Sequence, residues 1–495
     1  MTRGAAGKGS VSRLRPWLLQ LPLLLAACHG HDAERPVIAD IFGQQAELAD
    51  PLHHDLEAAG QTVLGATAQG LVAFDAQGEI VAGLAESWIV IDGGQTYIFR
   101  LRHTKWANGQ PVKADMVARL LQQRMRASPD LLAGLEPQIR AMTDRIIEIR
   151  LETAIPAFIQ LLAQPRLAIF GKDGGTGPYL GKMKQHRLYL SPVADDLDDE
   201  SDDGDHAVRP IDRRTLEAAR PALALVHFQD GQSDLVLGGR FQDLLLIPHV
   251  RLGSTDVRVD PTPGLFGLAI IGKSAFLADR GVRDALSRAV DRDQLAAALN
   301  LQGWTMATAP LPAQLDLPRT PTMPDWASSP ASDRIAHAEA VIARWKSAHG
   351  APPVLRIALP VGAGATLLFN RLVADYRQLG LGMERVGPDD DADLRLIDEV
   401  AGFDSALWYL SRLDCAAGLI CDQDASGFLE QARKAENPIA QATALSEAER
   451  RIVVNAAFIP LGLPIRWSLV SRRLTGFAPS PRAIHPLNAL FRAAN

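Results

Sequence analysis

Residues 354–386 constrain the fold of this chain more than any other segment. An apolar run at residues 354–359 has the length of a strand, and residues 368–379 carry apolar side chains at helical spacing. Gly380 follows as a helix C-cap, and residues 382–386 form a second strand-like run. A strand, a helix and a second strand in this order make a βαβ unit, so we predict the α/β class with an open sheet.

A second segment, residues 281–300, has the pattern of one amphipathic helix. Its apolar side chains recur at helical spacing, and its charged side chains lie on the opposite face. The apolar positions are Val282, Ala285, Leu286, Ala289 and Val290. We therefore predict a helix over residues 281–300 that packs one face on the core.

The region after Gly70 has the texture of antiparallel strands. Apolar runs at residues 71–74, 89–91 and 97–101 are separated by turn residues, and an Asp-Gly step at residues 92–93 is a hairpin signal. A helix is predicted after the next turn because four apolar side chains share one face. They are Val117, Leu120, Leu121 and Met125.

Residues 1–27 have the composition of a secretory signal peptide. Four basic residues precede an apolar core at residues 17–25, about half of the roughly 20 residues that a membrane-spanning helix needs. Small residues then lead to Cys28, a pattern that resembles the bacterial lipobox. In proteins with that motif the chain is cut before the cysteine, which is acylated, so Cys28 is expected to carry a lipid anchor. The alternative is an ordinary signal peptide with a chance cysteine.

The two remaining cysteines support an oxidising compartment. An even number of cysteines in an exported chain favours a disulfide, so Cys415 and Cys421 are predicted to close a small loop. Two independent buried thiols are the alternative, since the approach of the two Cα atoms is not visible in a sequence.

Charge and length exclude several classes of protein. The formal net charge is −6 and becomes −10 without the four cations of the signal segment, so nucleic acid is not an expected partner. A chain of 495 residues with 47% hydrophobic residues is long enough for two or more domains. After residue 28 no apolar run is long enough to cross a bilayer, and the lipid is the expected membrane attachment.

Two segments look like known ligand motifs but lack essential residues. The link at residues 362–364 follows a strand, yet it has neither the third glycine of a dinucleotide site nor a Gly-Lys-Ser/Thr step, so we predict a loop without a cofactor. The acidic segment at residues 195–205 resembles a calcium loop from Asp199 onwards. Its twelfth position is Pro210, where a glutamate is required, and we predict a solvated loop without metal.

Motifs along most of the chain resemble those of the bacterial extracellular solute-binding proteins of family 5. They occur in the family's order over roughly residues 37–482, and the most recognisable is the helix motif VRDALSRAVDR at residues 282–292. The others lie at residues 70–75, 81–88, 94–102, 106–111, 175–179, 231–234, 458–461 and 476–479.

The resemblance implies a two-lobed periplasmic-binding-protein fold of type II, in the large cluster C form, with an extra subdomain in the first lobe. The implied division is a signal peptide at residues 1–27, a lipid-anchored tether at 28–36, the first lobe at 37–70, 175–262 and 466–495, its extra subdomain at 71–174, and the second lobe at 263–465.

It also implies a function in transport. The expected protein is a monomeric lipoprotein of the periplasm or cell envelope that captures an oligopeptide or another small solute in an interdomain cleft. It delivers the solute to an ABC permease in the inner membrane and uses no cofactor. Closure is stabilised because the ligand contacts both walls.

The ligand residues depart from the family pattern. In peptide-binding members a cleft tryptophan is followed at three and six residues by aspartates, and the first pairs with the peptide's ammonium. Here Trp408 and Tyr409 are followed by Ser411 at the first position and Asp414 at the second. A hydroxyl does not replace a carboxylate in a charge-assisted bond. Either Asp414 takes the role, or Asp404 does in a shifted alignment, or the ligand has no free amine. Burial of both aromatic side chains in the core is the alternative.

Other functions are weighed against transport. An exported hydrolase lacks support because no Gly-x-Ser-x-Gly, His-Glu-x-x-His or β-lactamase-type motif is present, so we expect no enzyme. A sensor with the same fold but no permease remains open. His53 and His54 beside Asp55 suggest a nickel or haem site, although adjacent side chains alternate sides in a strand. The motifs leave open whether the anchor lies in the inner or the outer membrane.

Overall fold

The computed structural model describes residues 35–492 apart from 52–56, 133–134, 156, 172–173, 194–211, 254–255, 302–303 and 316, and also three single positions near the N-terminus. Outside the described residues lie the predicted signal peptide apart from those three positions, Cys28, most of the tether, the acidic loop at 195–205, and the pair His53 and His54.

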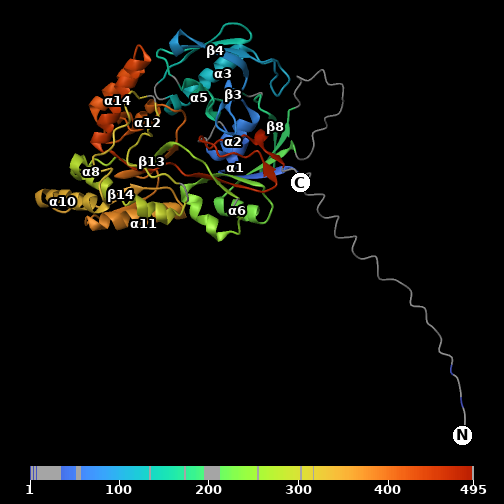
Figure 1. Ribbon diagram of the computed structural model, residues 1–495. Coiled ribbons are helices and arrows are strands. Elements are labelled where there is room, and N and C mark those ends of the chain that lie inside the picture. The colour runs from blue at the N-terminus through green and yellow to red at the C-terminus, as the bar shows by residue number, and fades with distance from the viewer. Residues whose placement is uncertain are drawn as a thin grey trace.

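A seven-stranded sheet forms the first lobe (Figure 1). Its strand order is β12-β18-β11-β1-β10-β9-β8, and β1 pairs in parallel with both β10 and β11. The strands are β1 (Val37–Phe42), β8 (Tyr179–Lys184), β9 (Arg187–Pro192), β10 (Arg214–Ala219), β11 (Leu235–Arg240), β12 (Val257–Val259) and β18 (Arg466–Val470). Helices α1 (Gln45–Ala49), α2 (Ala58–Thr67) and α6 (Pro221–Gln229) pack on this sheet.

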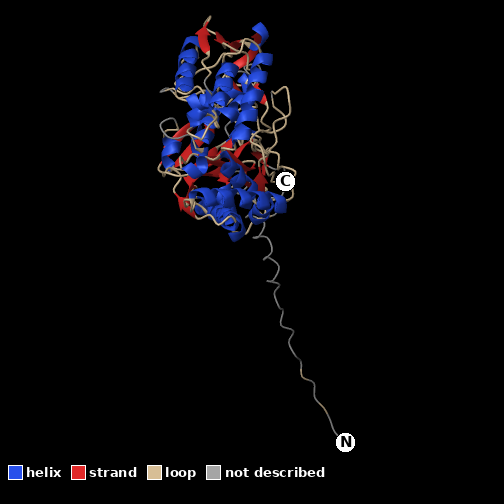
Figure 2. Cartoon of the chain, turned by 90° about the vertical axis from the view of Figure 1, so that its left-hand side faces the viewer, coloured by secondary structure: helices blue, strands red, loops and turns tan. Residues whose placement is uncertain are grey.

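A five-stranded sheet in the order β15-β14-β16-β13-β17 forms the second lobe. Its strands are β13 (Gly264–Ile270), β14 (Leu355–Ala358), β15 (Met383–Val386), β16 (Leu394–Val400) and β17 (Phe458–Gly462). β13 is buried along its whole length because helices cover the sheet, as Figure 2 shows by the dense helical layers around the strands. The helices of this lobe include α7 (Ala275–Ala278), α8 (Arg280–Ala289), α9 (Arg292–Leu299), α10 (Ala331–His349) and α11 (Ala363–Gln378).

A smaller antiparallel sheet, in the order β4-β5-β7-β6, lies at the far end of the molecule (Figure 1). It comprises β4 (Ala85–Ile91), β5 (Thr96–Leu101), β6 (Gln138–Ala141) and β7 (Ile146–Arg150), with α3 (Ala114–Arg126), α4 (Pro129–Leu132) and α5 (Phe158–Leu162) beside it. The apolar core of this sheet continues into α12 (Ala406–Ser411), α13 (Gln423–Arg433) and α14 (Pro438–Asn455) of the second lobe.

The chain passes between the lobes at two adjacent places, after β12 and before β18. The Thr262 hydroxyl donates to the carbonyl of Pro464 at 2.7 Å, and the amide of Asp260 donates to the carbonyl of Arg466 at 2.9 Å. These contacts hold the two connecting segments side by side. Asp260 and Arg466 also line the cavity described below, so the cavity lies next to these connecting segments.

The predicted α/β class and the βαβ unit are confirmed, since β14 and β15 pair in parallel with α11 between them. The predicted single helix over residues 281–300 is wrong. Val290 is extended at ψ 119°, and a new helix, α9, begins at Arg292, because the side chain of the N-cap residue Asp291 accepts a hydrogen bond from the amide of Gln294 at 3.0 Å.

The prediction of a loop at residues 362–364 is also wrong in part, because α11 begins at Ala363. A Cβ atom at Gly364 would lie 2.1 Å from the carbonyl oxygen of Phe241. Only glycine allows the helix to approach the first lobe this closely. The glycines therefore serve helix packing.

A buried carboxyl group predicts a pH dependence of stability. Asp40 of β1 is 1% exposed, and burial raises its pKa from 3.8 to about 6. The contact between Oδ2 of Asp40 and Nδ1 of His227, at 2.9 Å, acts in the opposite direction but is the smaller effect. A raised folded-state pKa means that the folded protein binds this proton more tightly, so the contribution is full below pH 3.8 and lost as the pH rises through about 6.

We therefore expect Asp40→Asn to gain stability relative to the unaltered protein as the pH rises. Between pH 4.5 and 7.5 the difference in unfolding free energy should shift by about 2 kcal/mol in favour of the variant, measured by urea unfolding. Asp230→Asn, at an exposed position on the same side of the sheet, should show no such trend. A constant difference across this pH range would contradict the prediction.

Candidate functional site

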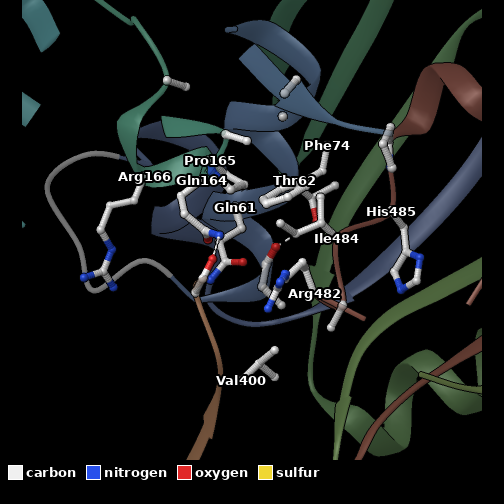
Figure 3. Close-up of a pocket in the computed structure, with 18 of the residues that line it drawn as sticks. Gln61, Thr62, Phe74, Gln164, Pro165, Arg166, Val400, Arg482, Ile484 and His485 are labelled. Carbon is white, nitrogen blue, oxygen red and sulfur yellow. Dashed lines mark hydrogen bonds between the residues drawn. The ribbon is translucent and has the colours of Figure 1, made fainter. Parts of the chain in front are cut away.

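A cavity of about 750 Å³ lies between the two lobes, within the size range of small-molecule sites (Figure 3). Its first-lobe wall comes from α2, the strand β2 (Val72–Phe74), the end of β11 and residues 482–489. Its second-lobe wall comes from residues 398–402 with Trp408 and Arg412. Both lobes therefore contribute side chains to one space.

Two glycines bring the wall of the first lobe close to an indole ring. Gly238 has a φ of +88°, and a Cβ atom there would lie 2.7 Å from the Cβ of Ala58. A Cβ atom at Gly239 would lie 2.3 Å from the ring of Trp467, which is buried and lines the cavity. Because neither position tolerates a side chain, the indole forms this part of the wall.

Charged side chains line the cavity in pairs. Three carboxylates accept hydrogen bonds from arginines at 2.6 to 2.9 Å, and the pairs are Arg240 with Glu57, Arg466 with Asp398, and Arg412 with Glu399. A fourth carboxylate, Asp260, contacts His485 Nε2 at 3.1 Å and accepts the amide of Ser480 at 2.9 Å. The cavity is thus polar, but the charges of these carboxylates are largely balanced by basic side chains of the protein itself.

Further contacts join the lobes beside the cavity. Arg482 is nearly buried, lies 2.5 Å from Asp404, and donates to the carbonyl of Ala401 at 2.9 Å. The amide of Asp404 donates to the side-chain oxygen of Gln160 at 2.8 Å, and Gln164 donates to the carbonyl of Gly402. Figure 3 shows Arg482 and Gln164 at the cavity. This network holds residues 401–404 against the first lobe.

Among the residues predicted to bind ligand, Trp408 is at the wall of the cavity, but its side chain is only 1% exposed and belongs to the same buried core as Tyr409. Tyr409 is buried in the core, where burial raises the pKa of its hydroxyl. Asp404 lies in the network with Arg482, outside the lining.

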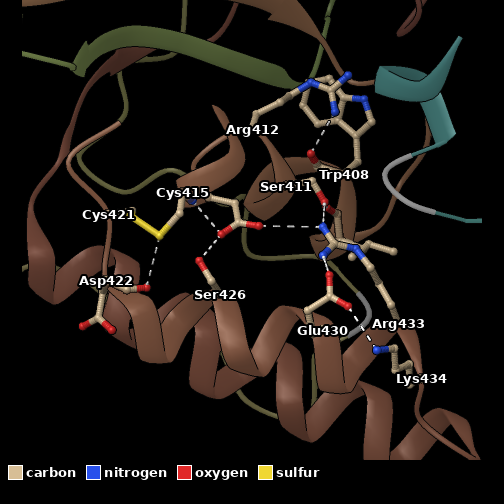
Figure 4. A network of polar contacts seen from close by, with 12 residues as sticks. Trp408, Ser411, Arg412, Cys415, Cys421, Asp422, Ser426, Glu430, Arg433 and Lys434 are labelled. Atoms are coloured by element: carbon tan, nitrogen blue, oxygen red, sulfur yellow. Dashed lines mark hydrogen bonds and ion pairs between the residues drawn. A yellow bond between two sulfur atoms is a disulfide. The ribbon is translucent and has the colours of Figure 1, made fainter. Parts of the chain in front are cut away.

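Neither Ser411, at the end of α12, nor Asp414, which follows this helix, lines the cavity, and Figure 4 shows Ser411 beside Arg433 of α13. Ser411 donates to the carbonyl of Leu407 at 2.7 Å and accepts from Arg433 at 3.2 Å. Asp414 is buried, accepts from the Cys415 amide at 2.7 Å and from the hydroxyl of Ser426, and lies 3.9 Å from Arg433. Their polar atoms are therefore engaged within the second lobe.

Cys415 and Cys421 form a disulfide with a Cα–Cα distance of 4.9 Å (Figure 4). The bond joins the segment after α12 to the start of α13 and does not line the cavity. It stiffens the turn that holds Asp414 beside α13.

Sequence reasoning missed most of the lining. Gln61 and Thr62 come from α2, Phe74 from β2, and Arg482 from the C-terminal segment, none of which carries a recognisable ligand motif. The available signal was Arg412, which follows Trp408 by one helical turn and therefore shares its face.

In the part of the chain that the structure describes, no group of three or more His, Cys, Asp or Glu side chains is placed to hold a metal ion. Likewise, no helix among the described residues has both the length and the apolar composition for crossing a membrane.

Sequence comparison matches the chain to a family model. The model "Bacterial extracellular solute-binding proteins, family 5 Middle" matches residues 79–343. The chain is 31% identical over 181 residues to the probable deoxycholate-binding periplasmic protein YgiS of Escherichia coli, covering 30% of this chain and 34% of that protein. It is 25% identical over 328 residues to the periplasmic oligopeptide-binding protein OppA of Salmonella typhimurium, covering 57% and 58%. The chain thus spans about a third to three fifths of these curated relatives.

Structural comparison covers nearly the whole chain. The murein tripeptide binding protein MppA of Escherichia coli superimposes with a TM-score of 0.77 at 17% identity, covering 93% of this chain and 99% of that one. OppA of Haemophilus influenzae in complex with RPPGFSPFR gives a TM-score of 0.73 at 16% identity, with the same coverage. These similarities confirm the predicted two-lobed periplasmic-binding-protein fold.

Proposed function

The chain belongs to family 5 of the bacterial extracellular solute-binding proteins, and we propose that it captures an oligopeptide or another small solute between its lobes for import by an ABC permease. The observation that carries the proposal is the cavity of about 750 Å³ with walls from both lobes. A ligand that contacts both walls favours the closed arrangement of the lobes, because only that arrangement offers all of its contacts.

Relatives with different ligands support a solute of this size. The names of the related proteins include an oligopeptide-binding protein, a murein tripeptide binding protein and a probable deoxycholate-binding protein. An Escherichia coli nickel-binding periplasmic protein is also 34% identical over 143 residues. Peptides are the proposed ligand class, and a non-peptide acid is the second candidate because of the arginines in the lining.

The membrane attachment is part of the proposal. The basic, apolar and small-residue segments before Cys28 support acylation of that cysteine after cleavage. The intact mass of the full-length chain extracted from bacterial membranes tests this directly. Attached acyl chains on a protein that begins at Cys28 would support the anchor, and an unmodified chain in the soluble fraction would contradict it.

Native mass spectrometry tests the capture of a solute. The chain that starts after Cys28 is purified without refolding, and the spectrum is recorded before and after denaturation. We expect a bound mass that is released on denaturation and lies in the range of a short peptide or a small acid. An empty spectrum, followed by the absence of a thermal shift with peptides, metal chelates and haem, would overturn the proposed transport function.

A further inference from the structure

The guanidinium group of Arg412 lies over the ring of Trp408 at the wall of the cavity. Its central carbon lies 3.8 Å from the ring centroid of Trp408, and both residues line the cavity (Figure 4). Nη1 donates to the carbonyl of Trp408 at 3.0 Å, and Nε donates to Glu399 at 2.6 Å. Stacking and two hydrogen bonds therefore fix the plane of this group before any ligand arrives.

Part of this guanidinium remains available. An arginine side chain has five N–H donors, and the contacts above use Nε and one hydrogen of Nη1. Within the described residues, Nη2 of Arg412 has no hydrogen-bond partner, and the side chain keeps 14% of its exposure. The N–H groups of Nη1 and Nη2 point along one edge of a planar cation, the arrangement that matches the two oxygens of a carboxylate.

The carboxylates of the lining already have partners within the protein. Each one in the described part of the cavity already has a cationic or amide partner. The remaining member, Asp75, accepts the backbone amides of Gln77 and Glu79 at 2.9 Å within its own turn. Ser411 and Asp414 occupy the two aspartate positions of the family pattern. Both contact Arg433 and lie outside the lining of the cavity.

We propose that Arg412 binds a carboxylate of the solute, so that the site selects acids and does not require a free amino group. This inference rests on the proposed capture of a small solute in the cavity. The carboxylate comes either from the C-terminus of a peptide or from a non-peptide acid, and the recognition is the same. The carboxylate of the solute binds along the free edge of Arg412, while the rest of the solute faces the first-lobe wall.

The test uses a mixed pool of tripeptides in four forms: unmodified, N-acetylated, C-amidated, and blocked at both ends. Deoxycholate, an acid without an amine, is the fifth probe. Affinities are measured by competition in native mass spectrometry. We expect N-acetylation to change the affinity by less than about 3-fold and C-amidation to weaken it by about 10-fold or more, the usual effect of losing a charge-assisted pair.

Three variants assign this preference to Arg412. In Arg412→Met, the difference between acid and amide should fall to about 1-fold, and the affinity for deoxycholate should fall with that of the acidic peptides. In Arg356→Met, which removes an arginine of the same lobe outside the lining, the difference should persist. In Glu399→Gln, which removes the competing carboxylate, acids should bind more tightly, an effect that loss of folding would not produce.

The possible failures are separate. Binding that requires the free amine and ignores C-amidation would overturn the inference and leave the proposed function intact. A preference for acids that persists in Arg412→Met would overturn the assignment to this residue. Weaker binding of acids by a folded Glu399→Gln variant would do the same. If neither the pools nor deoxycholate bind to the folded protein, the inference fails together with the proposed function.

Discussion

Replacement of Trp467 by alanine is expected to lower the unfolding free energy by about 3–5 kcal/mol, the usual cost of removing a large buried aromatic side chain. Trp467 lies in β18, is 1% exposed, and its ring packs edge-on against Phe42 at 5.5 Å. Its indole N–H donates to the carbonyl of Arg240 at 2.9 Å. The substitution therefore removes packing and leaves a carbonyl without its partner.

The position of Trp467 makes the loss larger than that of an ordinary core residue. The ring covers Gly239, where no other side chain fills the space, and it belongs to an apolar cluster that runs from the first lobe into β13 of the second. Backbone collapse cannot close the gap without moving β11. We also expect weaker solute binding, since the indole forms part of the cavity wall.

Urea unfolding monitored by circular dichroism measures this effect. Trp88→Ala is the matched control, because Trp88 is only partly buried in β4 and should cost clearly less. Equal losses in the two variants would contradict a special role for Trp467. A large loss of unfolding free energy in Trp467→Ala, with unchanged affinity for the solute, would show that the ring stabilises the core but does not contribute to solute binding.

The second large effect is expected for Arg292→Met. Arg292 begins α9 and is 4% exposed, and burial lowers the pKa of its guanidinium to about 10, which leaves the group charged at neutral pH. Nε donates to the carbonyls of Pro460 and Ala307 at 2.9 and 3.0 Å. Nη1 donates to the carbonyl of Ser287 at 3.1 Å, which ties the end of α8 to β17.

Methionine fills a similar volume but satisfies none of these carbonyls. Since each buried acceptor that loses its donor costs about 1–3 kcal/mol, we expect a loss of about 3 kcal/mol or more in unfolding free energy. Arg280→Met is the control, because this arginine on α8 is exposed and donates from Nε to the carbonyl of Val454. A change below about 1 kcal/mol in Arg292→Met would show that water replaces the lost donors.

Local patterns in the sequence were sufficient for several elements. The βαβ unit at residues 354–386 was predictable because strand and helix periodicities reflect which side chains face the core. The break between α8 and α9 was not, since residues 281–300 keep their apolar spacing across it. It depends on the side chain of Asp291, and on Asp375 from α11, which accepts the amide of Asp291 at 3.1 Å.

By itself, the sequence determined the α/β class and the family. Only the tertiary structure decided which polar groups face the cavity. Arg433 of α13 engages Ser411 and Asp414 from the far side of α12, while Arg412, their sequence neighbour, turns to the cavity. The physical reason is that hydrogen bonding and charge pairing act through space, between residues as distant as Glu57 and Arg240, whereas periodicity reports only on neighbours along the chain.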